Sequence, residues 1–460
     1  MRRRDIMRGM TEPASDQNIT DTAVIDTDVL VIGGGPAGST AATLLARKGW
    51  RVLLLEKGRH PRFHIGESLL PMNLPILERL GVLEQVRAIG THKPGAEFPI
   101  DDHNYNTFRF ERALNPLFGY AYQVKREEFD QLLFEHAKTN GVDAREEVKV
   151  ERIEFGTDGR PTLAHARDAA GNALRIRPRY FVDASGRDTL FGSQLKLKQK
   201  NELHQSAAIF SHFKGVERRP GEDAGNITVQ RFAHGWMWLI PLQHDVMSVG
   251  AVCFPEYLKT RRGDNEGFLL QTLESEPAAW SRMQGAERVA PVHVTGNYSY
   301  TCSRMTGPGW VMVGDAYAFV DPVFSSGVYL GMNSAEHAAE VVDGTLREPA
   351  REAALQRAMV KRIKRGLKHF QWFIYRFTTP VMRHLFNNPR NVWQVEQAVI
   401  SMLAGDVFDN RAVLRRLRVF RAIYALTAVS MAPSALRGWL RRRRQVGVAI
   451  SGDTLQAGNP

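Results

Sequence analysis

The sequence has few cysteines and no long apolar run. Its 460 residues contain two cysteines, Cys253 and Cys302, too few for a disulfide framework and typical of a protein from a reducing compartment. No stretch reaches the roughly 18 consecutive apolar residues that a membrane-spanning helix needs. The basic start, residues 1–10, lacks the apolar stretch of a secretory signal after it. Zinc-ligand spacings, a P-loop and a Gly-x-Ser-x-Gly elbow are also missing. These absences favour a soluble cytoplasmic enzyme without a metal site.

Positive charge is concentrated at one end of the chain. The net charge is +12, but residues 351–460 hold 20 Lys and Arg against 5 Asp and Glu, a net +15. The first 350 residues, with 41 basic and 44 acidic side chains, are therefore close to neutral at −3. A basic protein can bind nucleic acid or a membrane surface, but here the basic balance describes only the C-terminal region. We expect either solvated helix faces there or a docking surface for an acidic partner, and we expect no nucleic acid.

Strand and helix patterns alternate in the N-terminal part of the chain. A buried strand over residues 24–35, a helix over 36–48 and a second strand over 50–56 form a βαβ unit. Short buried strands recur at 180–183 and 310–314, residues 205–300 alternate like an antiparallel sheet, and the chain beyond 350 has helical periodicity. The predicted fold class is α/β: a three-layer, Rossmann-like dinucleotide-binding domain with a mostly parallel sheet, an inserted antiparallel β-sheet substrate domain and a C-terminal helical region.

The expected boundaries follow from these patterns. Residues 1–23 are a disordered leader; residues 24–100, 176–200 and 295–346 form the dinucleotide-binding domain. Residues 101–175 and 201–294 form the β-rich substrate-binding domain, and residues 347–460 form the basic helical region.

A glycine fingerprint lies between the first strand and the first helix. Gly33, Gly35 and Gly38 fit G-x-G-x-x-G, in which the glycines serve the tight turn, the approach of a pyrophosphate and close helix–strand packing. The helix N-terminus offers free N–H groups to that anion. Glu56 ends the next strand, where an acid accepts a hydrogen bond from a ribose hydroxyl. This arrangement predicts a dinucleotide site.

Two later segments resemble those of FAD enzymes. Residues 182–187, Val-Asp-Ala-Ser-Gly-Arg, and residues 314–316, Gly-Asp-Ala, each follow a short buried strand. They resemble FAD-contacting segments of the aromatic hydroxylase and halogenase flavoproteins. The resemblance implies FAD as the cofactor.

Four further segments resemble the flavin-dependent halogenases in particular. Residues 236–241 match W-x-W-x-I-P, residues 66–71 read Gly-Glu-Ser-Leu-Leu-Pro, and Lys93 follows Glu67 by 26 residues, where that family carries its catalytic lysine. Residues 319–327 fit the F-x-x-P-x-x-S-x-G pattern of members that act on phenols and pyrroles. Residues 123–130 resemble a Q-V-x-R-x-x-F-D segment of the family. The resemblance covers roughly residues 24–345 and keeps their order.

The resemblance implies a reaction and a role for each residue. FADH2, O2 and chloride or bromide give a hypohalous acid, which Lys93 passes to an electron-rich phenol- or pyrrole-like substrate, while Trp236 and Trp238 separate flavin from substrate. The backbone N–H groups of a glycine-containing turn that opens a helix suit a halide ion, which points to Ser325, Ser326 and Gly327. The expected cofactor-binding residues are Gly33, Gly35, Ala37, Gly38, Glu56, Glu67, Ser68, Gln123, Arg126, Asp183, Gly314, Asp315 and Pro322.

Partners and alternatives complete these expectations. Because no second dinucleotide fingerprint is evident, a separate flavin reductase is expected to supply FADH2. The substrate is either free or bound to a carrier protein, and the basic C-terminal region suits an acidic acyl or peptidyl carrier protein. Phe324 replaces the glutamate of tryptophan halogenases, which argues against free tryptophan. An aromatic monooxygenase, a geranylgeranyl-reductase-like enzyme and a protein that only carries FAD remain alternatives. Local alternatives are core packing for the Trp pair, a polar turn at Lys93 and a helix-start salt bridge at Arg126.

Overall fold

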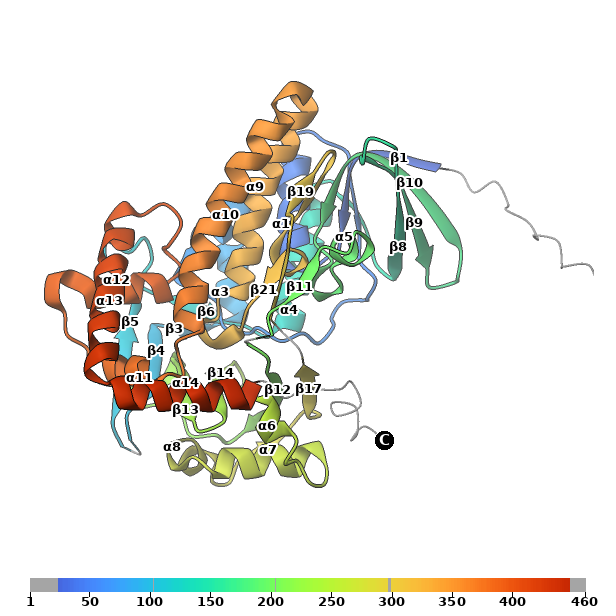
Figure 1. Ribbon diagram of the computed structural model, residues 1–460. Coiled ribbons are helices and arrows are strands. Elements are labelled where there is room, and N and C mark those ends of the chain that lie inside the picture. The colour runs from blue at the N-terminus through green and yellow to red at the C-terminus, as the bar shows by residue number, and fades with distance from the viewer. Residues whose placement is uncertain (1–23, 102, 203, 297–298, 447–460) are drawn as a thin grey trace, which may run out of the picture.

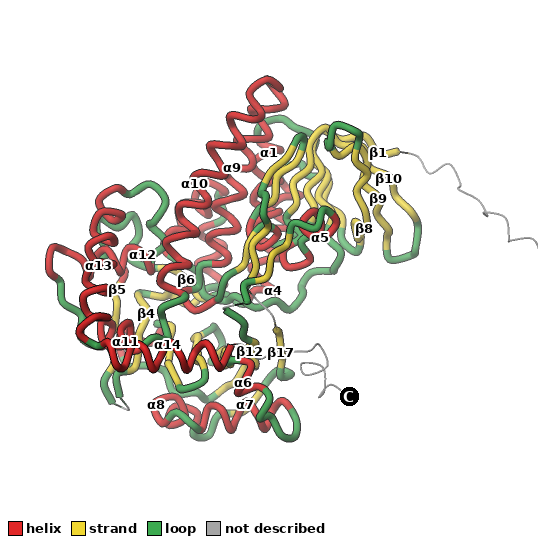
Figure 2. Tube along the Cα trace, in the orientation of Figure 1, coloured by secondary structure: helices red, strands yellow, loops and turns green. Residues whose placement is uncertain are grey.

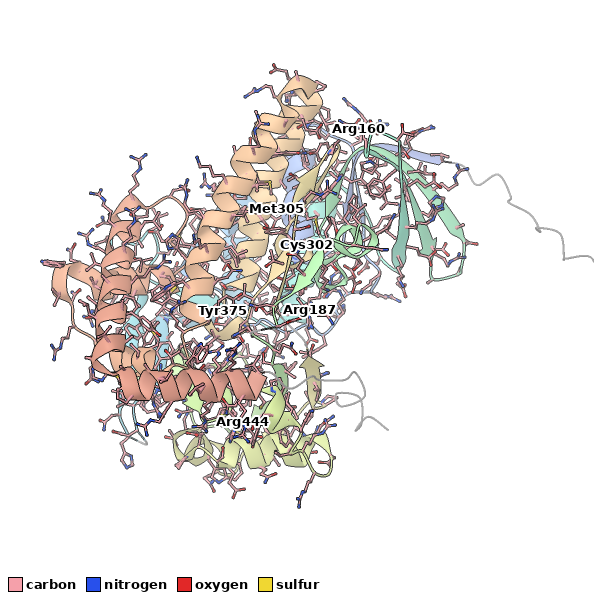
Figure 3. The ribbon with its side chains drawn as sticks, in the orientation of Figure 1. Arg160, Arg187, Cys302, Met305, Tyr375 and Arg444 are labelled. Carbon is pink, nitrogen blue, oxygen red and sulfur yellow. The ribbon has the colours of Figure 1, made fainter. Side chains whose placement is uncertain are left out.

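Two large sheets and a set of long helices make up the protein (Figures 1 and 2). The computed structural model describes residues 24–446 apart from 102, 203, 297 and 298, so the predicted leader lies outside the described residues. Cys302 lies in the interior (Figure 3), and it and Cys253 are free, buried thiols. The prediction of a fold without a disulfide framework is therefore confirmed.

The first sheet is mostly parallel, as predicted. Its strand order is β19-β20-β10-β1-β2-β7; the strands from β20 to β7 pair in parallel with one another, and β19 pairs antiparallel with β20. A hairpin of β8 and β9 pairs antiparallel with the first part of β10. The bounds are β1 Val24–Ile32, β2 Val52–Leu55, β7 Asp143–Arg145, β8 Val148–Phe155, β9 Pro161–Asp168, β10 Ala173–Asp183, β19 Thr306–Gly307 and β20 Trp310–Met312.

Helices cover this sheet. α1 (Pro36–Arg47) packs against α9 (Gly327–Arg347) and α4 (Arg126–Thr139), and α9 packs against α10 (Glu352–Ile374). Figure 1 shows α9 and α10 lying side by side. Small residues along α1, including Ala41 and Ala42, are fully buried and permit this close approach. Shorter helices are α2 (Leu74–Leu80), α3 (Leu83–Ile89) and α5 (Leu190–Gln194).

The second sheet is antiparallel except for one pair. Its order is β16-β12-β15-β14-β13-β4-β5, with β17 beside β12, and only β13 and β4 pair in parallel. The bounds are β4 Gly95–Pro99, β5 Tyr105–Arg109, β12 Ala207–Lys214, β13 Ile227–Phe232, β14 Gly235–Pro241, β15 Val246–Cys253, β16 Glu287–Arg288 and β17 His293–Gly296. Small sheets join β3 (Thr91–Lys93) to β6 (Ala121–Gln123), and β11 (Lys198–Lys200) to β18 (Tyr300–Cys302) and β21 (Ala318–Phe319).

The second sheet buries both of its faces. Met237 and Leu239 of β14 belong to a small apolar cluster that also contains residues of α7 (Asn265–Glu274), with α6 (Pro255–Leu258) and α8 (Pro277–Trp280) nearby in sequence. The alternate residues of the same strand, Trp236 and Trp238, belong to the main core of the protein. Because side chains alternate along a strand, the tryptophan pair faces the dinucleotide-binding part of the molecule.

The region after α9 is helical, as predicted. It contains α10, α11 (Pro380–Asn387), α12 (Val395–Leu403), α13 (Arg411–Ser430) and α14 (Ala432–Val446), and the described part of this region has no strand. Within the described ranges, no single helix passes a length and composition test for a membrane span; α13 and α14 pass it only as a pair bent by 99°.

Strand pairing corrects the expected boundaries in two places. β4, expected in the dinucleotide-binding domain, pairs in the second sheet, and β7, β8 and β9, expected in the substrate domain, pair in the first. The physical reason is that an alternating apolar pattern predicts a strand but carries no information about the sheet that it joins. The remaining division stays a prediction.

Candidate active site

The three dinucleotide segments meet at one edge of the first sheet. Ile32 of β1 lies beside Asp183 of β10, which lies beside Met312 of β20. All three strands are parallel, so the segments that follow them leave from the same edge, where open α/β sheets bind ligands. A Cβ added to Gly314 would lie 3.6 Å from the Cβ of Ala37, which shows that the first and third segments are in contact.

The glycine fingerprint has the geometry that a cofactor cradle requires. Gly33 has a φ of +103°, and a Cβ there would lie 2.4 Å from the Ala184 carbonyl oxygen. A Cβ on Gly38 would lie 1.8 Å from the Gly33 oxygen, so both positions exclude a side chain. A Cβ on Gly35 would meet nothing closer than Arg62 Nη2 at 3.8 Å. The free space beside Gly35, at the uncapped start of α1, fits a bound pyrophosphate.

Glu56 is hydrogen-bonded to this loop. Its carboxylate is buried and accepts hydrogen bonds from the backbone N–H groups of Gly34 (2.7 Å) and Gly58 (2.9 Å). Arg62, which the sequence analysis did not single out, reaches it at 3.3 Å. Glu56 therefore lies at the predicted place, and its role toward ribose stays a prediction.

Asp183 and Asp315 have different surroundings. Both Asp183 oxygens accept from backbone N–H groups, those of Ser185 (3.0 Å) and Phe191 (2.9 Å), so this carboxylate holds the loop after β10. Asp315 is half-buried, and burial raises the pKa of its carboxyl to about 6, opposed by the nearby charges of Arg187 and Arg126. Gly314 donates its N–H to the Ser334 hydroxyl at 2.8 Å.

The segment with Glu67 and Ser68 lies beside Lys93. Lys93 ends β3, which pairs with β6, and Ser68 forms a β-bridge with Gln123 at the end of β6. The Lys93 ammonium donates to the Ser68 hydroxyl and the Leu69 carbonyl oxygen, each at 2.8 Å. The side chain is 1% exposed and lies 5.3 Å from the Phe110 ring, and burial lowers its pKa to about 7. A buried lysine is not a polar surface turn, so that local alternative is wrong.

The neighbours of Lys93 retain unused polar atoms. Glu67 Oε1 pairs with His212 Nε2 at 2.8 Å, whereas Glu67 Oε2 and Gln123 Oε1 are buried without a hydrogen-bond partner among the described residues. Burial lowers the pKa of His212, but the hydrogen bond and the negative charge of Glu67 together raise it above its usual value. Unsatisfied buried acceptors of this kind are expected where a polar ligand binds.

The tryptophan pair forms a continuous aromatic wall. The ring centroids of Trp236 and Trp238 are 5.7 Å apart, both side chains are buried, and Trp238 Nε1 donates to the Ser248 hydroxyl at 3.2 Å. The wall depends on Gly250 of β15, because a Cβ there would lie 2.5 Å from the Trp238 ring. The sequence alone does not reveal this role of Gly250, because it depends on the pairing of Gly250 with Trp238 across β15 and β14.

The predicted halide segment opens the long helix α9. Ser325 adopts the left-handed conformation with a φ of +55°, Ser326 is the N-cap, and Gly327 is the first helical residue. No side chain caps this end and no acid lies in its first turn, so the first N–H groups are free of intrahelical partners. Phe324, just before, packs on Phe377 at 5.4 Å, and Pro322 begins the preceding turn.

Arg126 makes the salt bridge that was left open as an alternative. Its guanidinium forms a two-point ion pair with Asp130, at 2.7 and 2.9 Å, and donates to the Ile65 carbonyl oxygen at 2.7 Å. These contacts join α4 to the loop that precedes Glu67. A direct contact of Arg126 with flavin stays a prediction.

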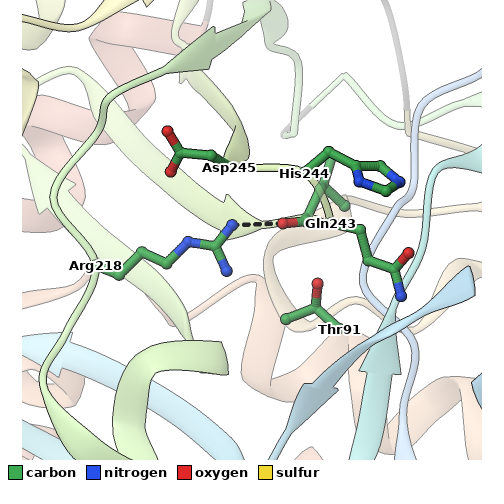
Figure 4. A pocket seen from close by; sticks show the side chains of 6 residues that line it. Thr91, Arg218, Gln243, His244 and Asp245 are labelled. Atoms are coloured by element: carbon green, nitrogen blue, oxygen red, sulfur yellow. Dashed lines mark hydrogen bonds between the residues drawn. The ribbon is translucent and has the colours of Figure 1, made fainter.

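Two surface pockets differ in their relation to these residues. One, of about 400 Å³, is lined by Thr91, Arg218, Leu242, Gln243, His244 and Asp245 and contains none of the predicted site residues (Figure 4). The other, of about 270 Å³, joins residues just after Ser68 to the C-terminal helices. Its lining includes Pro71, Leu114 and Ser401, and the Leu114 N–H donates to the Ser401 hydroxyl at 2.8 Å. The contribution of α12 was not predicted.

Known proteins resemble the chain over most of its length. A family model for the FAD binding domain matches residues 26–372. Similar curated proteins include tryptophan 2-halogenase of Chondromyces crocatus, 39% identical over 69% of this chain and 61% of its own. Flavin-dependent halogenase gsfI of Penicillium aethiopicum is 32% identical over 84% and 75% of the two chains. The 1H-pyrrole-2-carbonyl-(peptidyl-carrier protein) chlorinase of Pseudomonas fluorescens is 29% identical over 85% and 92%. The chain thus spans less than two thirds of the first relative.

Solved structures of flavoproteins have a similar fold. A flavoprotein/dehydrogenase from Cytophaga hutchinsonii has a TM-score of 0.80 and 29% identity, covering 88% of this chain and 100% of its own. The flavin-dependent brominase Bmp2 has a TM-score of 0.76 and 28% identity, covering 86% and 99%. Fold and site together define an FAD-binding oxidoreductase. The chain belongs to the flavin-dependent halogenases.

Proposed function

We propose that the protein halogenates an electron-rich aromatic compound, phenol- or pyrrole-like, by way of Lys93. The observation that carries the proposal is the buried lysine itself: its ammonium is held on the Glu67–Leu69 segment, and burial lowers its pKa to about 7. A lysine near neutrality offers both a donor and a nucleophilic amine. A purely structural role would not explain why an ammonium group is buried here, because burying a charge is costly.

The residues present fit FAD. The Gly33–Gly38 loop and the start of α1 suit the pyrophosphate, Glu56 the ribose, and the segments at Asp183 and Asp315 the remainder of the same edge. Bound as FADH2, the cofactor would supply the two electrons that reduce O2 to the peroxide level, which is the oxidant that converts a halide ion to hypohalous acid. We propose a separate flavin reductase as the source of FADH2.

Lys93 would transfer the halogen in one of two ways. The ammonium form donates a hydrogen bond to hypohalous acid and makes its halogen more electrophilic. The neutral amine displaces water from hypohalous acid to form an N–halogen bond, and the aromatic ring then takes the halogen and returns a proton. A pKa of about 7 populates both forms at neutral pH.

The wall and the helix start have complementary tasks. The buried Trp236–Trp238 wall would keep the aromatic substrate away from the flavin and so suppress hydroxylation. The uncapped start of α9, at Ser325, Ser326 and Gly327, would hold the halide before it reacts.

Phe324 bears on the substrate. It lines the region next to α9 with an apolar ring where tryptophan halogenases are expected to carry a glutamate, which favours phenols and pyrroles that need no added activation. One relative is nevertheless a tryptophan 2-halogenase. Tryptophan therefore belongs in the panel of substrates that tests this preference.

The test measures halogenation and flavin oxidation separately. The purified protein receives FAD, NADH, a flavin reductase and bromide with phenols, pyrroles and tryptophan, and products are identified by mass spectrometry. We expect brominated product from the wild type, and from Lys93→Ala none, with flavin reoxidation retained. Hydroxylated product at every bromide concentration would instead establish the monooxygenase alternative.

The surface of α13 and α14 supports an acidic partner. Residues 411–446 carry ten arginines and no acidic residue, and Leu426, Val429, Leu436, Trp439 and Leu440 are each more than half exposed there. Figure 3 shows Arg444 toward the end of α14. We propose this surface as the docking site of an acidic carrier protein, as one relative acts on a carrier-bound pyrrole.

The test of this docking site is the rate of turnover of a carrier-bound substrate. That rate should fall as the salt concentration rises, and it should fall in the variants Arg441→Glu and Arg443→Glu. Insensitivity to both, or binding to anionic vesicles alone, would contradict docking.

A further inference from the structure

Arg231 of β13 is buried, and none of the described residues gives it an acidic partner. Three arginines are buried among the described residues: Arg126, Arg231 and Arg282. Arg126 pairs with Asp130 at 2.7 Å and Arg282 lies 3.7 Å from Glu97. Arg231, 8% exposed, has no carboxylate within ion-pair distance in the part of the chain that the structure describes. A buried charge without a counter-charge is costly, so its presence calls for a reason.

The immediate surroundings of Arg231 are aromatic. Its guanidinium carbon lies 5.0 Å from the centre of the Phe377 ring and 5.8 Å from that of Phe386. Nη2 donates to the Asn387 side-chain oxygen at 2.9 Å, whereas Nη1 is buried without any partner among the described residues. The two rings and one neutral amide compensate the charge only in part. One guanidinium edge is therefore left free to donate to an anion.

A second donor belongs to the residue that pairs with Arg231 across the sheet. Trp236 is the residue paired with Arg231 across β13 and β14, and its indole Nε1 is also buried without a partner among the described residues. Both side chains lie on the face of the sheet that carries Val229 and Trp238, where directly paired side chains are neighbours. Buried indole N–H groups usually find an acceptor. Two adjacent unused donors, one of them charged, form a binding element for an anion.

This pair lies next to the region assigned to the substrate. Phe377, which lies under the Arg231 guanidinium, also packs on Phe324, the residue just before Ser325 and the start of α9. The ring of Phe377 thus lies between Arg231 and Phe324. Trp236 belongs both to the donor pair and to the tryptophan wall.

From these contacts we infer that Arg231 Nη1 and Trp236 Nε1 bind a carboxylate of the aromatic substrate. A planar guanidinium matches a carboxylate better than a spherical halide, and the start of α9 already offers the halide a site. The inference rests on the proposed halogenation by way of Lys93. It favours a free aromatic acid as the substrate, and it competes with the carrier-bound substrate proposed for the surface of α13 and α14. A carrier-bound substrate has its carboxyl group in a thioester, which carries no negative charge. A free acid should therefore bind more tightly than its neutral counterpart, whereas a protein that acts on the carrier-bound form should show no such preference.

Binding without turnover is the direct test. Calorimetry of the FAD-loaded wild type with 4-hydroxybenzoate, pyrrole-2-carboxylate and indole-3-acetate, each against phenol, pyrrole or 3-methylindole, measures the value of the carboxylate. We expect tighter binding of at least one acid by about 10- to 100-fold, because hydrogen bonds to a charged group contribute that much. Arg231→Met should abolish the difference, and Trp236→Phe should reduce it by about threefold to tenfold.

Thermal unfolding separates binding from a structural role. Methionine in place of an unpaired buried charge among phenylalanines should leave the melting temperature unchanged or raise it. Arg282→Met is the matched control and should lower the melting temperature, because it leaves buried Glu97 with fewer partners. A lower melting temperature for Arg231→Met with unchanged ligand selectivity would mean that Arg231 only supports the fold.

Two further outcomes would overturn the inference. One is equal affinity of every acid and its neutral counterpart for the wild type. The other is a loss of bromide binding, but not of acid binding, in Arg231→Met, which would make Arg231 part of the halide site. The bromination assay with Lys93→Ala is scored independently, so failure of the proposed function does not imitate either result.

Discussion

The Lys93 ammonium lies 2.8 Å from the Ser68 hydroxyl, although 25 residues separate the two in the chain. The bridge between Ser68 and Gln123, and the pairing of β3 with β6, bring the two segments together. The position of the lysine is thereby set by backbone hydrogen bonds on both sides.

Lys93→Met should change how stability depends on pH. Burial lowers the pKa of Lys93 from 10.5 to about 7, so between these pH values the unfolded chain binds one proton more than the folded chain. The free energy of unfolding then rises with pH in this window, by at most about 1.4 kcal/mol per pH unit, and this contribution is flat below pH 7. Urea unfolding at pH 7.5 and 9.5 should show a smaller rise in the variant. Parallel curves would contradict the lowered pKa.

Ser68→Ala should loosen the lysine without removing it. The loss of one hydrogen bond to Nζ costs about 0.5–1.5 kcal/mol, or more if the ammonium is left unsatisfied. We expect a lower ratio of brominated product to oxidised flavin, because a less well placed lysine lets hypohalous acid escape. The check is the product yield per O2 consumed, and an unchanged yield would show that the Leu69 carbonyl is sufficient.

Gly35→Ala and Gly38→Ala should separate cofactor binding from folding. A Cβ on Gly35 has room in the protein, with its nearest neighbour at 3.8 Å, but it would enter the space for the pyrophosphate. A Cβ on Gly38 would lie 1.8 Å from the Gly33 oxygen. We therefore expect Gly35→Ala to keep the melting temperature of the FAD-free protein and to lose FAD affinity, measured by flavin fluorescence. Gly38→Ala should lose both.

Gly250→Ala should disturb the tryptophan wall. The added methyl would lie 2.3 Å from Phe210 Cβ and 2.5 Å from the Trp238 ring, an overpacking that costs about 1–3 kcal/mol. Urea unfolding and tryptophan fluorescence measure the effect. Gly267→Ala in α7 is the control: its methyl would meet only the flexible Asp264 carboxylate, at 3.1 Å, and alanine favours a helix.

His212→Gln should matter most in acid. The hydrogen bond to Glu67 raises the pKa of His212 above its usual 6.5, so the protonated pair stabilises the folded protein below about pH 6.5. That contribution is lost as pH rises through the raised pKa. The difference in free energy of unfolding between wild type and variant should be larger at pH 5.5 than at 8.5. An equal difference at both would mean that the histidine stays neutral.

Sequence periodicity predicted those parts of the fold and site that are formed by residues close together in the chain. The glycine loop, the helix after it and the strand ending at Glu56 lie within a few residues of each other, and their pattern has one physical solution. The spacing of Lys93 from Glu67 was informative because a family resemblance supplied its meaning. Lys93 burial and its contact with Ser68 then came from the structure.

Features that depend on register or on distant packing could not be predicted. Arg231 and Gly250 look ordinary in sequence, and only the pairing of β13, β14 and β15 places them beside Trp236 and Trp238. The assignment of β4 and β7 to their sheets failed for the same reason. Hydrogen bonds across hundreds of residues leave no local pattern.

The hydrogen bond from Leu114 to Ser401, with that from the Met72 N–H to the Ala404 carbonyl oxygen, ties the C-terminal helices to the segments on either side of Lys93. The pocket beside them is therefore composite, with one wall from residues 71–118 and the other from residues 401–410. Chimaeras that exchange only the C-terminal helices between halogenases will carry mismatched walls. The shape of this pocket is set by both segments together, so preserving it requires that both be moved together.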